Sequence, residues 1–337
     1  MIVLTAAAVA AGAILVGATS WDIALTVLHP GARGPISYRA NRAAWALVRA
    51  MSVRLDSRRL LSFAGPLAMG VNVVLWVAVL WLGFALVYVP FEAVYDALYI
   101  SGQSLTTVGF GDIVAEADAL RAISAFESAA GLGAFTAAIA YVLSVYPLVT
   151  AIRASALHVA DMGIDGPEGA TRVIATGGSI ELAAQLRAMT ESHEHIRRFQ
   201  ILYYFESGDT NESLGRLLRA GCATYLVLRW GIDAARVPVA GVYAPAYERA
   251  LDRLLTDFET DYVGGRRRQL ESPEGLEGQE AKEALERIRE AVRRAAPELV
   301  AYGEAGLEDL DRFLARAQSV TSAFAREHRQ REIPIVG

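Results

Sequence analysis

Residues 104–114 read Ser-Leu-Thr-Thr-Val-Gly-Phe-Gly-Asp-Ile-Val. Gly109 and Gly111 alternate with Val108 and Phe110, which is a poor sequence for a helix or a regular strand. Long apolar segments lie on both sides of it. The composition of those segments shows in what surroundings the irregular backbone must lie.

Charged residues are unevenly distributed along this chain of 337 residues, which is 53% hydrophobic. Residues 1–21 and 60–91 carry no charge, and Glu127 is the single charged side chain between Arg121 and Arg153. Each stretch is about as long as the ~20 residues that a helix needs to cross a hydrocarbon core. Three buried helices of a soluble protein would rarely lack charge over such lengths, so we predict three membrane spans.

The first apolar segment is interpreted as a retained membrane helix with Asp22 near its inner end. A secretory signal peptide needs Lys or Arg before its apolar region, and the first basic residue is Arg33. The lone Cys222 cannot form an intramolecular disulfide and reads as a small core residue. The net charge of -5 averages different compartments. We expect no nucleic-acid partner.

The charges of the connections predict the orientation in the membrane. The connection 31–60 has one acid, Asp56, and seven arginines: Arg33, Arg39, Arg42, Arg49, Arg54, Arg58 and Arg59. The connection 92–120 has no Lys or Arg and five acids: Glu92, Asp96, Asp112, Glu116 and Asp118. Basic residues mark the cytoplasmic side. We therefore expect an external N-terminus and a cytoplasmic region that starts at Arg153.

Apolar residues separate the arginines of the basic connection: Trp45, Leu47, Val48 and Met51. This pattern is typical of a helix that lies along the inner membrane surface, and also of an ordinary solvated connecting helix. Both interpretations stay open for residues 30–60.

The stretch before the glycines predicts a short helix. Residues 91–105 follow Pro90 and are too few to span a membrane. A short helix followed by irregular backbone indicates a re-entrant loop, because such backbone is tolerated at membrane depth only where protein encloses it or where it lines a watery path.

Thr107-Val108-Gly109-Phe110-Gly111, followed by Asp112, resembles the pore signature of potassium channels. The resemblance covers about residues 60–150, with a general likeness to bacterial channels outside it. It implies an all-α membrane protein whose channel domain is a helix, a re-entrant pore loop and a helix, with an extra N-terminal membrane helix and a largely helical cytoplasmic domain. The expected parts are an N-terminal helix 1–29, a basic linker or interfacial helix 30–60, a pore domain 61–152 and a cytoplasmic domain 153–337. Within the pore domain we expect an outer helix 61–90, a pore helix 92–105, a filter 107–111 and an inner helix 118–150.

The resemblance implies that backbone carbonyls of Thr107, Val108, Gly109 and Phe110 hold K+, since rings of carbonyls replace the water of the entering ion. Gly109 and Gly111 can take positive φ, which lets successive carbonyls turn to one axis. Val108 and Phe110 are then expected to pack against the short helix.

The filter is expected to be supported by Thr106, Asp112, Tyr99 and Gln103. In the resembling family the aspartate bonds to an aromatic residue on the pore helix, and Tyr99 has the matching position. Gln103 departs from the pattern, because some members have a buried carboxylate there. Phe110 departs too, because many members have tyrosine, and we expect a filter that selects potassium but is less firmly braced.

The inner helix offers hinge, cavity and polar candidates. Gly131 follows the last filter glycine at the spacing of the family's hinge, and Gly133 is a second candidate; close helix packing explains both glycines equally well. Leu132, Phe135 and Ile139 are expected to face the cavity, and Pro147 can kink the inner end. An acid in a spanning helix suggests function, and for Glu127 a hydrogen bond behind the filter and a role in conduction stay open.

The region after Arg153 is predicted to be helical, with an exposed link at 264–280. No dinucleotide-binding fingerprint occurs, although Gly177-Gly178 after residues 171–176 allows a strand and turn. His193 and His195 would point to different faces of a helix, which disfavours a metal site. We find no catalytic constellation and expect no enzyme activity and no cofactor, with K+ as the permeant ion.

One filter signature per chain cannot surround an ion, so we expect a homotetramer in the lipid bilayer of the cell membrane. The alternatives are a weakly selective cation channel, and a membrane sensor whose cytosolic domain is the active part. A potassium-uptake transporter with four degenerate pore repeats is disfavoured by the single signature.

Overall fold

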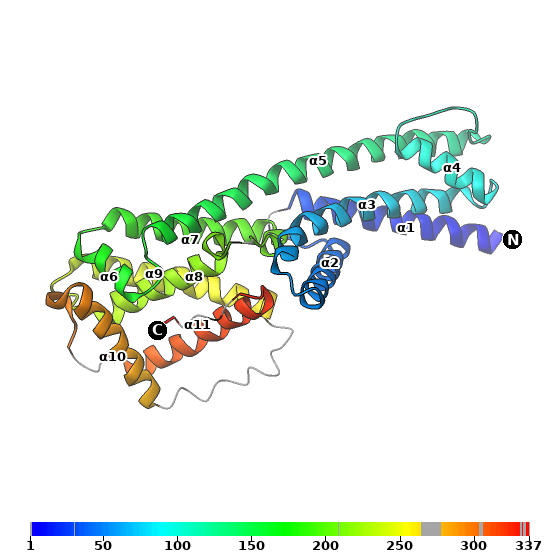
Figure 1. Cartoon of the computed structure of the whole chain (residues 1–337). Helices are drawn as coiled ribbons and strands as arrows, with labels where there is room; N and C mark the ends of the chain where they lie inside the picture. Colours follow the sequence, from blue (N-terminus) through cyan, green and yellow to red (C-terminus); the bar gives the residue numbers. More distant parts are fainter. Residues whose placement is uncertain are drawn as a thin grey trace. The chain divides into compact units, whose positions relative to one another are not determined.

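The computed structural model describes residues 2–29, 31–207, 209–263, 278–302, 306–330, 332 and 335–336. Throughout these residues the regular elements are helical, apart from an isolated antiparallel bridge between Ile232 and Val300 (Figure 1). The expected all-α class is therefore confirmed. Residues 264–277, most of the expected link, lie outside the described residues.

The chain divides into two compact units. Unit 1 contains residues 1–148 and 196–206, and unit 2 contains residues 149–195 and 207–337. The C-terminal region expected to start at residue 153 is therefore not one block, because residues 196–206 pack with the membrane helices. Nothing local in the sequence marks that return.

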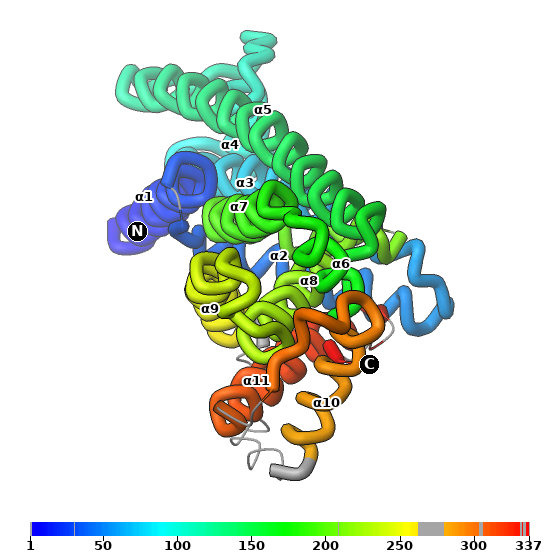
Figure 2. Tube along the Cα trace, turned by 90° about the vertical axis from the view of Figure 1, so that its left-hand side faces the viewer, coloured from blue at the N-terminus to red at the C-terminus, as the bar shows by residue number. Residues whose placement is uncertain are grey.

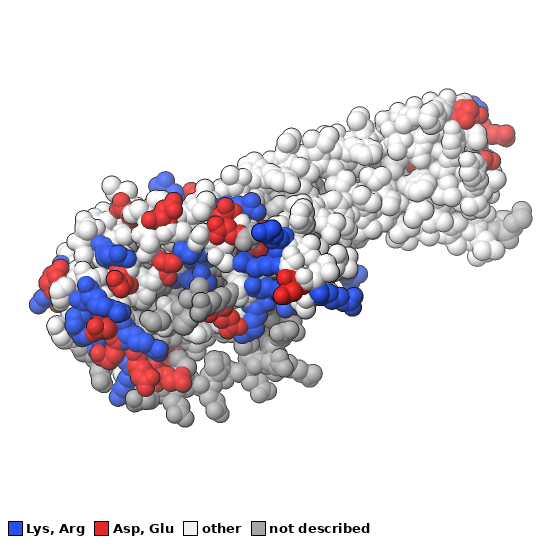
Figure 3. Space-filling model, viewed as in Figure 1, with Lys and Arg blue, Asp and Glu red and all other residues white. Residues whose placement is uncertain are grey.

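Unit 1 holds the three candidate membrane spans. They are α1 (Ile2–Val27), the 3-10 turn η1 (Arg58–Phe63) continued by α3 (Ala64–Tyr88), and α5 (Asp118–Asp161), which runs past the expected end at residue 150. Figure 3 shows hardly any charged side chain along these helices, as the uncharged stretches require. These three helices are long and apolar enough to be the expected membrane spans.

Glycines let α1 and α3 approach closely. A Cβ at Gly12 would lie 2.5 Å from the carbonyl oxygen of Gly83, and a Cβ at Gly83 would lie 2.9 Å from Val16 Cγ2. Small residues at such contacts are the usual means by which membrane helices pack, since lipid supplies no hydrophobic force between them. The first helix is therefore packed directly on the outer helix of the pore.

A buried carboxylate sets the start of α2 (Pro35–Arg54). Asp22 of α1 is fully buried and accepts hydrogen bonds from the backbone N–H groups of Ile36 (2.7 Å) and Ser37 (3.2 Å). The Ser37 hydroxyl and the Trp76 indole, at 3.0 Å, also donate to it. Asp22 thus caps α2 from another helix and joins α1, α2 and α3.

One face of α2 packs in unit 1 through Ala44, Trp45 and Val48. Its other face is exposed and carries Leu47, Met51 and Val53 beside Arg39, Arg42 and Arg54. Figure 1 shows α2 running across the direction that α1 and α3 share.

Unit 2 is helical and centres on α8 (Leu214–Leu226) (Figure 2). Residues 217–228 are all buried, and burial raises the pKa of the Cys222 thiol to about 12. The other helices of this unit are the end of α5, then α6 (Pro167–Ala175), α7 (Ser179–Arg198), α9 (Pro238–Phe258), α10 (Gly278–Ala295) and α11 (Leu307–Glu327). The short elements are η3 (Thr210–Glu212), the π turns η4 (Val227–Gly231) and η5 (Glu259–Val263), and η7 (Pro297–Leu299).

Two details of unit 2 bear on the sequence interpretation. The strand that residues 171–176 allowed is absent, because Pro167 starts a helix there and Gly177 ends it with a φ of +75°. His193 Nε2 lies 2.7 Å from Asp257 Oδ2. In the described parts of the chain, no group of three or more His, Cys, Asp or Glu side chains is arranged to hold a metal.

Candidate ion pathway

The pore helix is held in place by a tryptophan of the outer helix. The helix is α4 (Val94–Leu105), which starts two residues after the expected Glu92. The Trp81 indole donates to the carbonyl of Leu98 at 2.9 Å, and the Ser101 hydroxyl donates to the carbonyl of Trp81 at 2.9 Å. These bonds tie α4 to α3 at two places one turn apart.

The backbone after α4 alternates in the sign of φ. Thr107 (+59°), Gly109 (+58°) and Gly111 (+78°) are left-handed, whereas Val108 and Phe110 are not. Alternating handedness aligns successive peptide groups instead of pointing them to opposite sides. The stretch therefore has a backbone that can present a row of carbonyls to one side.

Thr107 is the member of this alternation that sequence reasoning missed. A β-branched residue at positive φ is uncommon and costs on the order of 1–3 kcal/mol. The Thr107 N–H donates to the carbonyl of Ser104 at 3.0 Å, which fixes the turn out of α4. The only sign of a positive φ at Thr107 in the sequence is its position two residues before Gly109, because a threonine prefers a negative φ.

Gln103 braces the stretch from behind. Its backbone carbonyl accepts from the N–H groups of Val108 (3.1 Å) and Gly109 (3.3 Å). Its side-chain oxygen accepts from the Gly111 N–H at 3.2 Å, and its amide NH2 donates to the carbonyl of Ile113. An amide donates and accepts at the same time, whereas an ionised carboxylate only accepts. Where some family members have a carboxylate, Gln103 thus makes both kinds of hydrogen bond without having to be protonated.

The outer end of the stretch is held by aromatic and acidic side chains. The Tyr99 hydroxyl donates to Asp112, with distances of 2.9 and 3.0 Å to its two oxygens. The Tyr99 ring lies between those of Tyr95 and Phe110, each stacked at a centroid distance of 6.4 Å. Phe110 thus contacts the pore helix, but it is 70% exposed and Val108 is 55% exposed on the single protomer.

The remaining support residue, Thr106, belongs to the end of the pore helix. Its hydroxyl donates to the carbonyl of Gly102 at 2.7 Å and closes the last turn of α4. Next to it, the hydroxyls of Ser104 and Ser124 are hydrogen-bonded and join α4 to α5.

Glu127 lies behind the pore helix and not on the candidate pathway. It is fully buried and accepts a hydrogen bond from the Tyr88 hydroxyl at 2.9 Å. Its other carboxyl oxygen is within hydrogen-bond distance of the Ser101 hydroxyl, whose one proton is shared between this oxygen and the Trp81 carbonyl. Because these residues belong to α4 and α3, the acid joins all three helices of the candidate pore. These contacts favour the first of the two open interpretations, a hydrogen bond behind residues 107–111.

The two hinge candidates have different surroundings. A Cβ at Gly131 would lie 1.9 Å from the carbonyl oxygen of Leu105, whereas a Cβ at Gly133 would meet nothing within 4 Å. Gly131 is therefore required for the close approach of α5 to the end of α4. The cavity candidates Leu132 (62%), Phe135 (37%) and Ile139 (62%) are exposed on the single protomer.

Residues 74–146 match the sequence model of a family described as "Ion channel". By this match the segment is similar to an ion channel, and it is called the ion channel domain here. It includes most of α3, all of α4, the glycine stretch and α5 as far as Tyr146. A family match over this segment agrees with the likeness to potassium channels that residues 107–112 carry.

A relative is similar over a longer stretch than the ion channel domain. An "Uncharacterized membrane protein YdjJ" of Bacillus subtilis (strain 168) is 28% identical over an alignment of 226 residues that covers 60% of this chain and 64% of that protein. The chain thus spans somewhat less than two thirds of this relative. The aligned length exceeds the ion channel domain, so the likeness includes residues outside it. No solved structure gives a significant match.

Proposed function

We propose that this protein is a potassium-selective channel in which four copies place residues 107–111 around one axis. The observation that carries the proposal is the alternation of φ at Thr107, Gly109 and Gly111 within an ion channel domain. A potassium ion that enters a narrow pore must lose its water, and carbonyl oxygens from four chains can replace it. The protein then acts on ions and not as an enzyme.

The need for several copies follows from the single stretch in each chain. One row of carbonyls covers one side of an ion, so symmetric copies must supply the others. The exposure of Val108, Phe110, Leu132 and Ile139 supports this proposal, because neighbouring copies would cover these apolar side chains.

Acidic residues suit the proposed outer mouth. Asp112, Glu116 and Asp118 are exposed, and Figure 3 shows acidic side chains gathered at the end of unit 1 where α4 and the start of α5 lie. Their field would raise the local cation concentration. The arginines of the connection 31–60 favour a cytoplasmic position for that connection, and we therefore propose that the acidic end is external.

The experiment is cation flux into liposomes that contain the purified protein. We expect K+ flux to exceed Na+ flux by at least about tenfold, which corresponds to ~1.4 kcal/mol of discrimination. Equal flux of the two ions would reject selectivity and favour a weakly selective cation channel. No flux of either ion would favour a membrane sensor.

A matched variant and a mass measurement complete the test. Gly109→Ala should abolish flux, because a residue with a Cβ rarely adopts the φ of +58° that Gly109 has. The cause would be this backbone conformation and not a clash, since a Cβ at Gly109 would meet no atom within 4 Å. Native mass spectrometry should give four chains for both proteins, so that lost flux is not lost assembly.

A further inference from the structure

Residues 199–206, called the latch segment here, lie against the membrane helices. Among the described residues after Arg153, only 196–206 group with unit 1, and the chain on both sides of them belongs to unit 2. The segment includes the 3-10 turn η2 (Gln200–Tyr204), in which Ile201, Leu202, Tyr203 and Tyr204 are buried. Because these side chains are buried, the segment is a packed part of unit 1 and not a loop on its surface.

Two aromatic residues of the latch segment contact the inner half of α5. The Phe199 ring packs on Tyr141 and the Phe205 ring packs on Tyr146, each edge to face at a centroid distance of 5.9 Å. A Cβ at Gly65 of α3 would lie 2.5 Å from the Phe205 ring. Phe205 is therefore seated between α3 and α5, and a glycine is needed to make room for it.

The latch segment is also bound to α2 and η1. Tyr204 contacts Trp45 of α2 at a centroid distance of 5.6 Å. Arg58 Nη2 lies 2.9 Å from Glu206 Oε1, and the Glu206 side chain is 4% exposed. A carboxylate so deeply buried depends on its partner, because burial of a lone charge is costly. The segment thus links α5 to the elements that precede α3.

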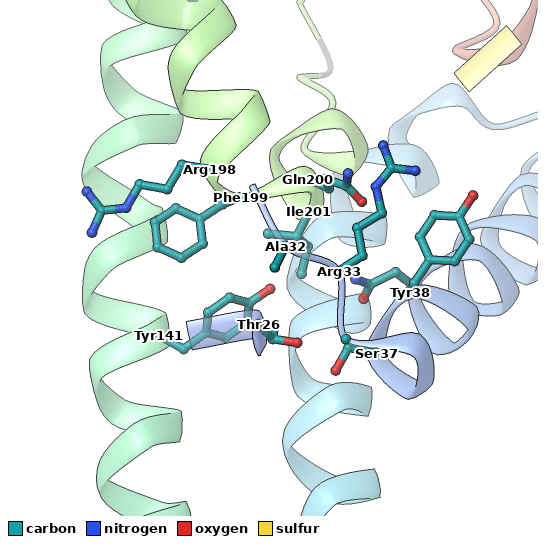
Figure 4. Close-up of a pocket in the computed structure, with 12 residues that line it drawn as sticks. Thr26, Ala32, Arg33, Ser37, Tyr38, Tyr141, Arg198, Phe199, Gln200 and Ile201 are labelled. Atoms are coloured by element: carbon teal, nitrogen blue, oxygen red, sulfur yellow. The ribbon is translucent and has the colours of Figure 1, made fainter. Parts of the chain in front are cut away.

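A small pocket lies beside the Phe199 ring. Its volume is about 30 Å³, enough for a water molecule, and its lining includes Thr26, Tyr141, Phe199 and Ile201. Figure 4 shows the rings of Phe199 and Tyr141 next to each other alongside α5. The Thr26 hydroxyl oxygen is buried without a hydrogen-bond partner. Packing here is incomplete, which lowers the cost of moving Phe199 out of its seat.

We infer that the latch segment restrains the inner half of α5, and that a change in unit 2 alters the pore by releasing this segment. α5 cannot move away from α3 while Phe199 and Phe205 hold their contacts. Both ends of the segment continue into unit 2, so a rearrangement there pulls directly on it. The inference rests on the proposed function, because α5 is taken as the inner helix of the channel.

A reversible crosslink tests the inference. Tyr146→Cys and Phe205→Cys are combined in a Cys222→Ala background, so that the new pair holds the only thiols. We expect oxidation to lower cation flux at least about fivefold and a reductant to restore it, with no redox response in either single-cysteine variant. Equal flux through the oxidised and reduced pair, at complete crosslinking, would overturn the inference.

The ion pair gives a second test with its own control. Arg58→Glu should raise resting flux by loosening the segment, and the double variant Arg58→Glu with Glu206→Arg should return it to the level of the unchanged protein. Unchanged resting flux in folded Arg58→Glu would count against the latch. Both tests compare fluxes of one ion, so they can be interpreted even if the channel does not select K+ over Na+. Conversely, a negative result for the latch segment would not affect the measurement of K+ selectivity.

Discussion

The hydroxyl and the backbone N–H of Ser37 both donate to the carboxylate of Asp22, which lies in a different helix. This relationship fixes where α2 begins after the first membrane helix. Gly34 makes it possible, since a Cβ there would lie 2.5 Å from Asp22 Oδ1.

Asp22→Ala should destabilise the protein. It removes the acceptor for Ser37, Ile36 and the Trp76 indole, and buried donors left unpaired cost about 1–3 kcal/mol. We expect a Tm in detergent lower by at least about 4 °C. Thr26→Val is the matched control, because the hydroxyl it removes has no partner. An equal loss in both variants would show that the carboxylate has no special part.

Gln103→Glu should make conduction depend on pH. An ionised carboxylate cannot donate to the carbonyl of Ile113, whereas a protonated one can. The brace is therefore incomplete at high pH and restored as the pH falls through the pKa of the new side chain. Flux through reconstituted Gln103→Glu should rise on acidification. Gln103→Leu, which never donates, should not recover, and recovery in that variant would refute the explanation.

Gly131→Ala and Gly133→Ala should differ sharply. The first places a Cβ 1.9 Å from a backbone carbonyl oxygen, so α5 must move away from α4, while the second adds a methyl group in open space on the protomer. We expect Gly131→Ala to lose the tetramer or the flux and Gly133→Ala to keep folding and assembly. If Gly133→Ala assembles but no longer opens, a hinge at that position is the better explanation.

Cys222 should resist alkylation in the folded protein. Burial raises the pKa of its thiol to about 12, so at pH 8 almost none of it is the reactive thiolate. Mass spectrometry after iodoacetamide treatment should show no adduct until the protein is denatured. Rapid labelling of the folded protein would mean that unit 2 opens readily around α8.

The exposed face of α2 should lie on the inner membrane surface. Residues 35–54 include no acid, and apolar side chains such as Leu47 and Val53 share the exposed face with arginines. A spin label at Leu47→Cys in liposomes should be relaxed by oxygen dissolved in lipid more than by an aqueous nickel complex. The opposite result would assign α2 to the solvated connecting helix.

Local patterns explain what the sequence allowed us to predict. Uncharged length predicted the membrane helices, and glycine at 109 and 111 predicted positive φ at those two residues. Thr107 escaped, because its φ is imposed by the turn out of α4 and opposes the preference of a β-branched residue. Gln103 was expected to support this stretch, but its hydrogen-bond partners could not be predicted, since they depend on how the chain folds back.

Contacts distant in sequence were beyond reach. Nothing in the spacing of residues 199–206 indicates that Phe199 and Phe205 meet Tyr141 and Tyr146. The cap on α2 was hidden for the same reason, because Asp22 is 14 residues before the first N–H that it accepts. Such pairings are decided by packing and not by periodicity.

The close contact between Gly12 and Gly83 bears on modularity. A pore of two helices and a loop is often regarded as a self-sufficient building block to which other helices are added. Here the surface of α3 is complementary to α1. If α1 were removed, no side chain at Gly83 would fill the space that it occupied. A chain engineered to start after residue 29 would expose that notch, and the buried indole of Trp76, to lipid tails. The first helix is a structural part of the pore, and its removal would damage the packing of the helices that remain.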